Sequence, residues 1–164
     1  MVWRTGIFLL LLTADYRPSA VGLPEETPHR ARVSVPVADL RKEPVPPQRT
    51  LDHDPLEESQ LLYGELVEVM GEREGWVRVA TLEQLEWTHH GRWEGYPGWM
   101  QKSTLVPTPD GWEPNLRVIT KLGKVRLAPR EDASLKYDLS IGSMLNGVRE
   151  GDWWKIHLLD GSTG

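Results

Sequence analysis

The sequence predicts an all-β protein, and three observations support this fold class. The chain of 164 residues contains eight Trp but one Phe, together with 15 Gly and 13 Pro, which is typical of short strands joined by tight turns. Apolar residues alternate with polar ones along several segments, as expected for a strand with one buried face. No segment shows a sustained period of 3.6 residues, so we expect little helix.

The composition excludes several classes of protein. Apolar residues make up 39% of the chain and charged residues 26%, as in a soluble globular protein rather than a disordered or multi-pass membrane protein. The net charge of −5 argues against a nucleic-acid partner, because such a partner requires a broad basic surface. The chain has no Cys, which excludes disulfides, thiolate metal sites and a Cys nucleophile within these residues.

The first 20 residues have the pattern of a signal peptide. Arg4 precedes the apolar run Gly6–Ala14, which is too short to span a bilayer but typical of an h-region, and Pro18–Ala20 would supply a cleavage region. On this interpretation the protein is exported to the cell envelope or the extracellular space, without an integral membrane span. A start at the wrong Met or a stray strand is the alternative, which leaves a cytoplasmic location open. Residues 21–31 are expected to form a linker.

The rest of the chain consists of two copies of one small β unit, with the boundary at Thr108–Gly111. Each copy contains short apolar segments, a Gly-containing turn and a Trp that opens a further strand. The corresponding pairs are Gly64 and Gly142, Trp76 and Trp153, Arg78 and Lys155, and Val79 and Ile156. One copy alone would bury little apolar surface, so we expect the two copies to pack together.

Alternation also predicts which way side chains point. Val67 and Val69 are expected to face one side of their strand, opposite Leu66, Glu68 and Met70. Three Trp are expected to fill the interiors, whereas Trp154 alternates to the other face, where it would line a contact with a neighbouring domain. The three expected core residues are Trp76, Trp99 and Trp153.

This arrangement resembles the bacterial SH3 domain. The resemblance rests on the run Leu62–Val79, with the pattern LxxGxxVxVxxxxxGWxRV, and on the later Gly98-Trp99. It implies two small SH3-like barrels in tandem, at residues 32–107 and 112–164. Gly164 stands in the second copy where Gly98 stands in the first, so the second barrel is expected to be truncated and the chain to be a fragment.

Two segments, Glu58–Gly64 and Gly95–Met100, are similar to the first SH3 module of NlpC-like cysteine peptidases. The similarity is to the subgroup that cleaves γ-D-glutamyl–L-diamino acid bonds in cell-wall peptides. It implies that Glu58 meets the α-ammonium of a murein peptide with a free N-terminal L-Ala, and that Tyr96 lies beside it. The catalytic domain, with its Cys and His, would then follow Gly164. This chain has no Cys, so by itself it should be inactive, and no cofactor or catalytic residue is expected.

Other interpretations remain open for the whole chain and for both candidate residues. A stand-alone SH3-type module that binds the cell wall or a protein, without hydrolysis, is the alternative function. Residues 31–107 contain eight basic and 13 acidic residues. The alternative for Glu58 is therefore an ordinary surface acid that serves solubility. Tyr96 lies in a Gly/Pro-rich corner, where a purely structural role is the alternative.

An insertion at residues 82–94 contains Trp87, His89, His90 and Trp93. We expect a β-hairpin with Gly91 at its turn, covering one end of the first barrel. Adjacent His residues without a third ligand predict no metal site. The alternative roles for the aromatic residues are to shape a binding cleft or to contact a protein partner.

Overall fold

A computed structural model of the chain, described at residues 28–47, 53–88 and 90–164, consists of β-strands and one 3-10 turn, η1 (Lys102–Thr104). The prediction of an all-β protein with little helix is confirmed. The expected signal peptide and residues 21–27 of the expected linker lie outside the described residues. The strands are β1 (His29–Val33), β2 (Val37–Arg41), β3 (Glu57–Leu62), β4 (Leu66–Arg73), β5 (Trp76–Trp87), β6 (Trp93–Gln101), β7 (Leu105–Pro107), β8 (Leu116–Arg117), β9 (Leu122–Arg126), β10 (Leu135–Ser140), β11 (Met144–Glu150) and β12 (Trp153–His157).

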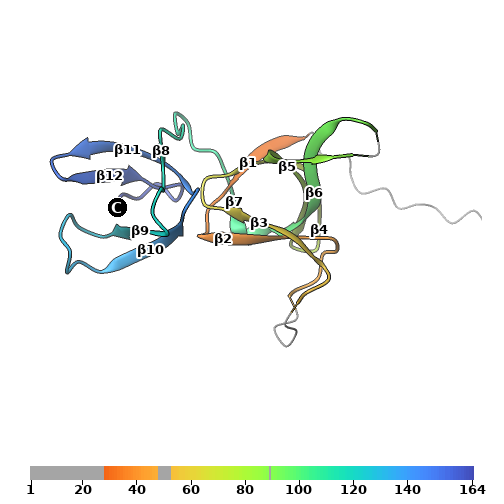
Figure 1. Cartoon of the computed structure of the whole chain (residues 1–164), viewed down its shortest axis with the longest axis horizontal. Coiled ribbons are helices and arrows are strands. Elements are labelled where there is room, and N and C mark those ends of the chain that lie inside the picture. The colour runs from red at the N-terminus through yellow and green to blue at the C-terminus, as the bar shows by residue number, and fades with distance from the viewer. Residues whose placement is uncertain (1–27, 48–52, 89) are drawn as a thin grey trace, which may run out of the picture.

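The first half of the chain, residues 28–107, forms one curved sheet of seven strands (Figure 1). The order is β3-β2-β6-β5-β4-β1-β7, and all neighbours are antiparallel. The ladder does not run on from β7 to β3, so the hydrogen bonding does not close the predicted barrel. One bridge, Arg41 opposite Trp99, joins β2 to β6.

Strand alternation determines the interior of this sheet. Val67 and Val69 of β4 are buried, while the residues between and beside them stay partly exposed, as the sequence predicts. The first core consists of small and medium apolar side chains from six strands, β1 to β6: Ala31, Val33, Ala38, Leu40, Leu61, Val67, Val69, Val77, Val79 and Met100.

The second half, residues 108–164, forms a two-stranded sheet, β10-β9, and a three-stranded sheet, β12-β11-β8. Figure 1 shows the two sheets facing each other beside the first half. A second core lies between them, and it includes Tyr63 from the first half and Trp112 from the segment that joins the halves. Its other members are Val118, Val125, Leu139, Leu145, Ile156, Leu158 and Leu159.

Tyr63 joins the two halves, which confirms that they pack together. Its side chain is 1% exposed, and its hydroxyl oxygen accepts a hydrogen bond from the Leu159 N–H at 2.7 Å. Its backbone carbonyl accepts another from the Met144 N–H at 2.9 Å. Burial raises the pKa of Tyr63 to about 12, because the phenolate would lose its hydration there.

Gly64, the next residue, allows this close approach for two reasons. Its φ of +85° suits glycine, and a Cβ at this position would collide with the Met144 carbonyl oxygen. Its own carbonyl accepts a hydrogen bond from Arg32 Nη1 at 2.7 Å. The buried Arg32 guanidinium also lies 4.9 Å from the centre of the Trp112 ring, so a cation–π contact supports the same junction.

The prediction that Trp76, Trp99 and Trp153 fill the cores is wrong. All three are half-buried, and none belongs to either core. Since Val77 points inward, strand alternation directs its neighbour Trp76 to the outer face. The tryptophan that is buried is Trp112, which is 5% exposed.

We expect Tyr63→Phe to lower the free energy of unfolding by about 1–3 kcal/mol, because it leaves the buried Leu159 N–H without an acceptor. Urea denaturation measures the change. Tyr137→Phe is the matched control: its ring centre lies 5.9 Å from that of Tyr63, but its hydroxyl bonds to none of the described residues. Equal losses in both variants would contradict the role assigned to the Tyr63 hydroxyl.

Candidate functional site

The structure brings Glu58 and Tyr96 together, although 38 residues separate them in sequence. Glu58 lies on β3 and Tyr96 on β6, the two neighbours of β2 in the sheet. The Tyr96 hydroxyl donates a hydrogen bond to Glu58 Oε2 at 2.8 Å. The other oxygen, Oε1, lies 3.2 Å from Lys42 Nζ, in an ion pair whose side chains are 19% exposed for Glu58 and 53% for Lys42.

Tyr96 is held by its backbone as well as by its ring. Its N–H donates to Thr81 Oγ1 at 2.9 Å, and its ring packs against the first core. Gly95 is needed beside it, because a Cβ there would collide with the Thr81 carbonyl oxygen. The hydrogen bond to Glu58 raises the pKa of Tyr96, since ionisation would abolish the donor and place two negative charges side by side.

Gln84 ties this part of β5 to β3. The β5–β6 register shifts between Ala80 and Leu85, which leaves Gln84 within a bulge that faces β3. Ser59 Oγ donates to Gln84 Oε1 at 2.6 Å, and Gln84 Nε2 donates to the Gln60 carbonyl at 2.9 Å. The bulge therefore holds β3, which carries Glu58, against β5, which positions Tyr96.

The second half contains an equivalent of this site. Glu58 stands six residues before Gly64, and Lys136 stands six residues before Gly142. Tyr96 stands two residues before Gly98, and Ser162 stands two before Gly164. The backbone supports the alignment: Gly98 pairs with Val79, and Gly164 exchanges two backbone hydrogen bonds, at 2.8 and 3.0 Å, with Ile156, the residue that corresponds to Val79.

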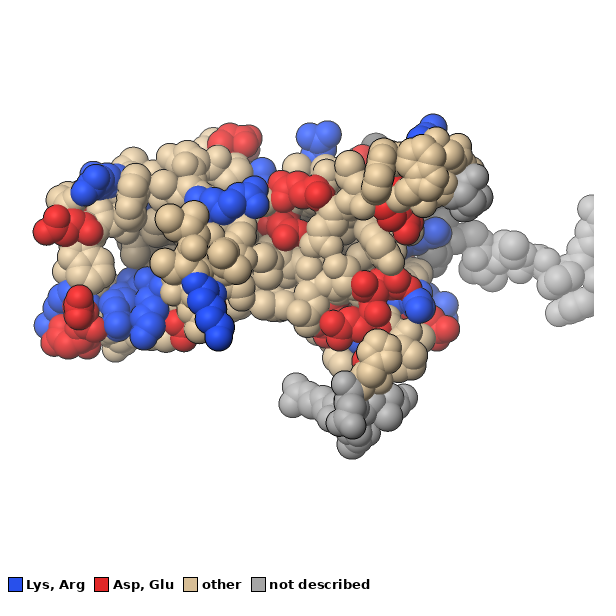
Figure 2. All heavy atoms as spheres, viewed as in Figure 1, with Lys and Arg blue, Asp and Glu red and all other residues tan. Residues whose placement is uncertain are grey.

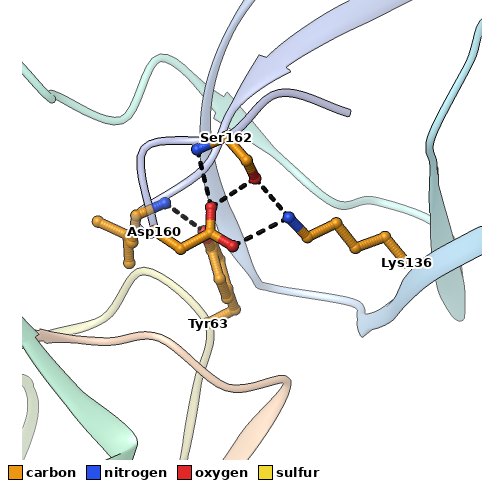
Figure 3. Close-up of polar contacts among 5 residues, drawn as sticks. Tyr63, Lys136, Asp160 and Ser162 are labelled. Carbon is orange, nitrogen blue, oxygen red and sulfur yellow. Dashed lines mark hydrogen bonds and ion pairs between the residues drawn. The ribbon is translucent and has the colours of Figure 1, made fainter.

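The equivalent positions also meet, but with a different charge. Lys136 Nζ bonds to Ser162 Oγ and lies 2.9 Å from Asp160 Oδ2, as Figure 3 shows beside Tyr63. Hydrogen bonds from Ser162 and then Lys136 lower the pKa of Asp160 to about 2. A lysine thus occupies the place of the Glu58 carboxylate, in a half where β10 pairs with β9 as β3 pairs with β2. The fold itself does not require an acid at this position.

The charges of the two halves differ. Residues 31–107 carry eight basic and 13 acidic residues, whereas residues 108–164 carry eight of each. Figure 2 shows acidic side chains gathered over the first half, with Lys and Arg more prominent over β9 and β10 of the second. The Glu58 carboxylate therefore lies on the half that attracts cations more strongly.

The insertion forms the expected hairpin between β5 and β6. Trp87 pairs with Trp93, and Gly91 has a φ of +72° in the turn. The two rings meet edge to face at 5.7 Å, and they are 62% and 63% exposed. His89 lies outside the described residues, and His90 contacts Glu94 at 3.1 Å.

The described residues contain neither a candidate metal cluster nor a membrane-spanning helix. Residues 28–47, 53–88 and 90–164 hold no group of three or more His, Cys, Asp or Glu that would suit a metal ion. No helix in this part of the chain is long and apolar enough to cross a membrane.

The sequence predicts Glu58 and Tyr96 as a pair but does not predict the residues that support them. Lys42, Thr81 and Gln84 stand in no motif, and their positions depend on a strand pairing and a bulge. The counterpart Lys136 was also missed, although its spacing from Gly142 equals that of Glu58 from Gly64. That spacing is a signal that the sequence alone contains.

Comparison with known proteins gives a match in structure but not in sequence. No protein family and no curated protein matches the chain. An NlpC/P60 family protein from Bacillus cereus matches with a TM-score of 0.65 and 20% identity, over 82% of this chain and 53% of that one. The chain shares the fold of part of that protein.

Two other solved structures match less well. NlpC2 from Trichomonas vaginalis has a TM-score of 0.34 and 11% identity, over 84% of this chain and 48% of that one. NlpC1 from the same organism has a TM-score of 0.32 and 13% identity, over 87% and 45%. The chain therefore spans about half the length of the solved proteins that it matches.

We expect the Lys136–Asp160 contact to make stability sensitive to acid. The pKa of Asp160 falls from 3.8 to about 2 on folding, so its contribution is present above pH 3.8 and is lost as the pH drops towards 2. In the Asp160→Asn variant, the free energy of unfolding should decrease less than in the wild type between pH 3.8 and pH 2. Urea denaturation at several pH values measures it.

Asp138→Asn is the control, because Asp138 is an exposed acid on the same strand as Lys136. If both variants keep the pH dependence of the wild type, the Asp160 contacts do not contribute to the acid sensitivity of the stability.

Proposed function

We propose that this chain is the substrate-recognition, non-catalytic region of a cell-wall peptide hydrolase of the NlpC/P60 type. Its ligand would be a murein peptide that begins with L-Ala-γ-D-Glu-diamino acid and carries a free α-amine. The observation that carries the proposal is the hydrogen bond from Tyr96 to Glu58. The fold shared with part of the Bacillus cereus protein supports the hydrolase class.

The chemistry of the site suits an ammonium group. Glu58 is largely shielded from water, and a shielded carboxylate forms strong, charge-assisted hydrogen bonds with N–H donors. Tyr96 holds one carboxylate oxygen in place while its phenol oxygen offers a second acceptor beside it. An N-terminal ammonium, with three donors, would satisfy both oxygens.

The same chemistry would exclude uncut peptidoglycan. There the L-Ala nitrogen is an amide with one N–H and no charge, so it could not replace Lys42 as the cation beside the Glu58 carboxylate. Sites that require a charged or polar partner discriminate strongly against ligands that lack it. The protein would thus act on trimmed peptides rather than on the intact wall.

The counterpart in the second half supports a functional rather than a structural role for Glu58. Lys136 occupies the equivalent place, where a cation would repel an ammonium ligand. The two halves would therefore have separate tasks, with ligand recognition in residues 32–107 and support in residues 112–164.

Hydrolysis would need residues that this sequence does not contain. A Cys nucleophile with a His base, in a catalytic domain next to the two modules, would carry out the hydrolysis. The leader at residues 1–20 favours a place in the cell envelope or outside the cell, where wall peptides are released.

A stand-alone binding module is the second candidate. The exposed edge-to-face pair of Trp87 and Trp93 favours it, because exposed aromatic side chains are typical of protein-binding surfaces. Replacing both by Ala would then abolish partner binding and leave peptide binding unchanged.

Calorimetric titration of the chain with L-Ala-γ-D-Glu-diamino acid peptide, beside its N-acetylated form, tests the proposal. We expect the free amine to bind and the acetylated peptide not to bind. Glu58→Gln should weaken binding at least about tenfold, since a hydrogen bond to a charged group contributes about 1.5–3 kcal/mol. Tyr96→Phe should weaken it less.

Glu57→Gln is the matched control, because Glu57 is the exposed neighbour on the same strand and points to the other face. Glu58→Lys, which copies the second half, should abolish binding while the far-ultraviolet circular dichroism stays unchanged. Equal affinity for both peptides would overturn the ammonium site and favour a general wall-peptide binder. Equal effects of the Glu57 and Glu58 variants would also overturn it.

A further inference from the structure

The ammonium group of Lys42 lies where a ligand ammonium would bind Glu58. Its Nζ is 3.2 Å from Glu58 Oε1, while Oε2 accepts the hydrogen bond from Tyr96. A lysine ammonium and an N-terminal ammonium carry the same charge and the same three donors. Because the Glu58 side chain is 19% exposed, little of the carboxylate is uncovered. A second cation therefore reaches Oε1 by replacing the first.

The backbone of Lys42 is fixed, although its ammonium is not. The Lys42 N–H donates to the Leu56 carbonyl at 2.9 Å, directly after β2. The preceding residue, Arg41, has a side chain that is 1% exposed and forms an ion pair with Asp54 at 2.9 Å. The Lys42 side chain, by contrast, is 53% exposed, and its four-carbon stem is flexible. The ammonium is therefore a tethered cation that can leave Glu58 without a change in the strands.

Lys42 also has a second partner, which a ligand at Glu58 does not remove. Its Nζ donates a hydrogen bond to the Pro55 carbonyl at 3.2 Å. Since a lysine ammonium has three donors, this bond can persist when the contact with Glu58 is broken. An exposed ion pair contributes little to stability, so a ligand that makes a better contact can displace Lys42.

The equivalent contact in the second half has the opposite arrangement. There the shielded partner is the cation, Lys136 at 20%, and the exposed partner is the acid, Asp160 at 46%. In the first half the shielded partner is Glu58 and the exposed partner is Lys42. The partner that a ligand can replace is the exposed one, so the first half is suited to exchange one cation for another.

We propose that Lys42 is an internal competitor for the ammonium site: it covers Glu58 in the free protein and is displaced by the α-ammonium of the ligand. The inference rests on the proposed function, because it requires Glu58 to bind an ammonium. A tethered cation has a high effective concentration at its partner, so the observed affinity falls by the fraction of Glu58 that Lys42 leaves open. Only a cationic ligand exchanges one ion pair for another, and Lys42 thereby strengthens the requirement for a charged amine.

This exchange has a consequence for the effect of salt. In the wild type one ion pair replaces another, so screening acts on both states and the affinity changes little. Without Lys42 the ligand ammonium approaches a carboxylate that has no cation beside it, and salt weakens that attraction.

Calorimetric titration of Lys42→Gln with L-Ala-γ-D-Glu-diamino acid peptide tests the proposal. We expect the affinity to rise roughly two- to fivefold over the wild type, the range for loss of an exposed ion pair. Between about 0.05 and 0.5 M salt, it should fall more steeply than that of the wild type. Lys102→Gln is the matched control. It removes the same charge from the same half, at a lysine that is 59% exposed and pairs with Glu72.

Nuclear magnetic resonance of the Lys42 Cε–Hε group follows the displacement directly. The resonance is identified by its absence in Lys42→Gln, and Glu58→Gln gives its position when the ion pair is absent. Saturating free-amine peptide should move the wild-type resonance towards that position, whereas the N-acetylated peptide should leave it in place.

Equal affinities of the Lys42→Gln and Lys102→Gln variants would overturn the role of Lys42. A Lys42 resonance that saturating free-amine peptide does not move would overturn it as well. In both cases, binding that still depends on Glu58 would leave the ammonium site intact. Absence of peptide binding to the wild type and to Lys42→Gln alike would overturn the ammonium site and the role of Lys42 together. Binding to Lys42→Gln alone would support the proposal, because Lys42 then keeps the site closed.

Discussion

The burial of one tyrosine connects the two halves of this protein, and the candidate site depends on that connection. Tyr63 follows directly after β3, the strand that carries Glu58, and its side chain lies in the core of the other half. Its hydroxyl and its carbonyl each accept a hydrogen bond from the second half. Because buried polar groups are costly to leave unpaired, β3 cannot shift without breaking this junction. The Tyr63 contacts therefore fix the position of Glu58 relative to the second half.

Close backbone packing strengthens the constraint. Gly64 lies where any side chain would strike the backbone of Met144, and the buried Arg32 binds the carbonyl of this same glycine. Arg32 in turn contacts Trp112, which is a member of the second core. A cation, an aromatic ring, a glycine and a phenol thus converge on one turn, where the two halves meet.

The internal comparison separates what the fold needs from what the site needs. Equivalent positions hold Glu58 and Tyr96 in one half and Lys136 and Ser162 in the other, and both pairs make a polar contact. In each half the contact joins two residues that are far apart in sequence. The sign of the charge is not shared, and a charge that the fold leaves free is available for recognition.

Sequence alone determined the local features of this protein: the strands, the turn at Gly91, the hairpin with Trp87 and Trp93, and the repeat. These features depend on residues that are close in sequence, through the alternation of apolar and polar side chains and the φ angles that glycine allows. They can therefore be predicted without knowledge of the tertiary structure. The prediction that the large side chains of Trp76 and Trp153 fill the cores was wrong, because strand alternation directs both to the outer face. Only the tertiary structure decided that Tyr63 belongs to the other core, that Lys42 pairs with Glu58, and that the Gln84 bulge holds β3. Each of these joins residues far apart in sequence, and such contacts arise from how strands pair and pack, which no local pattern encodes.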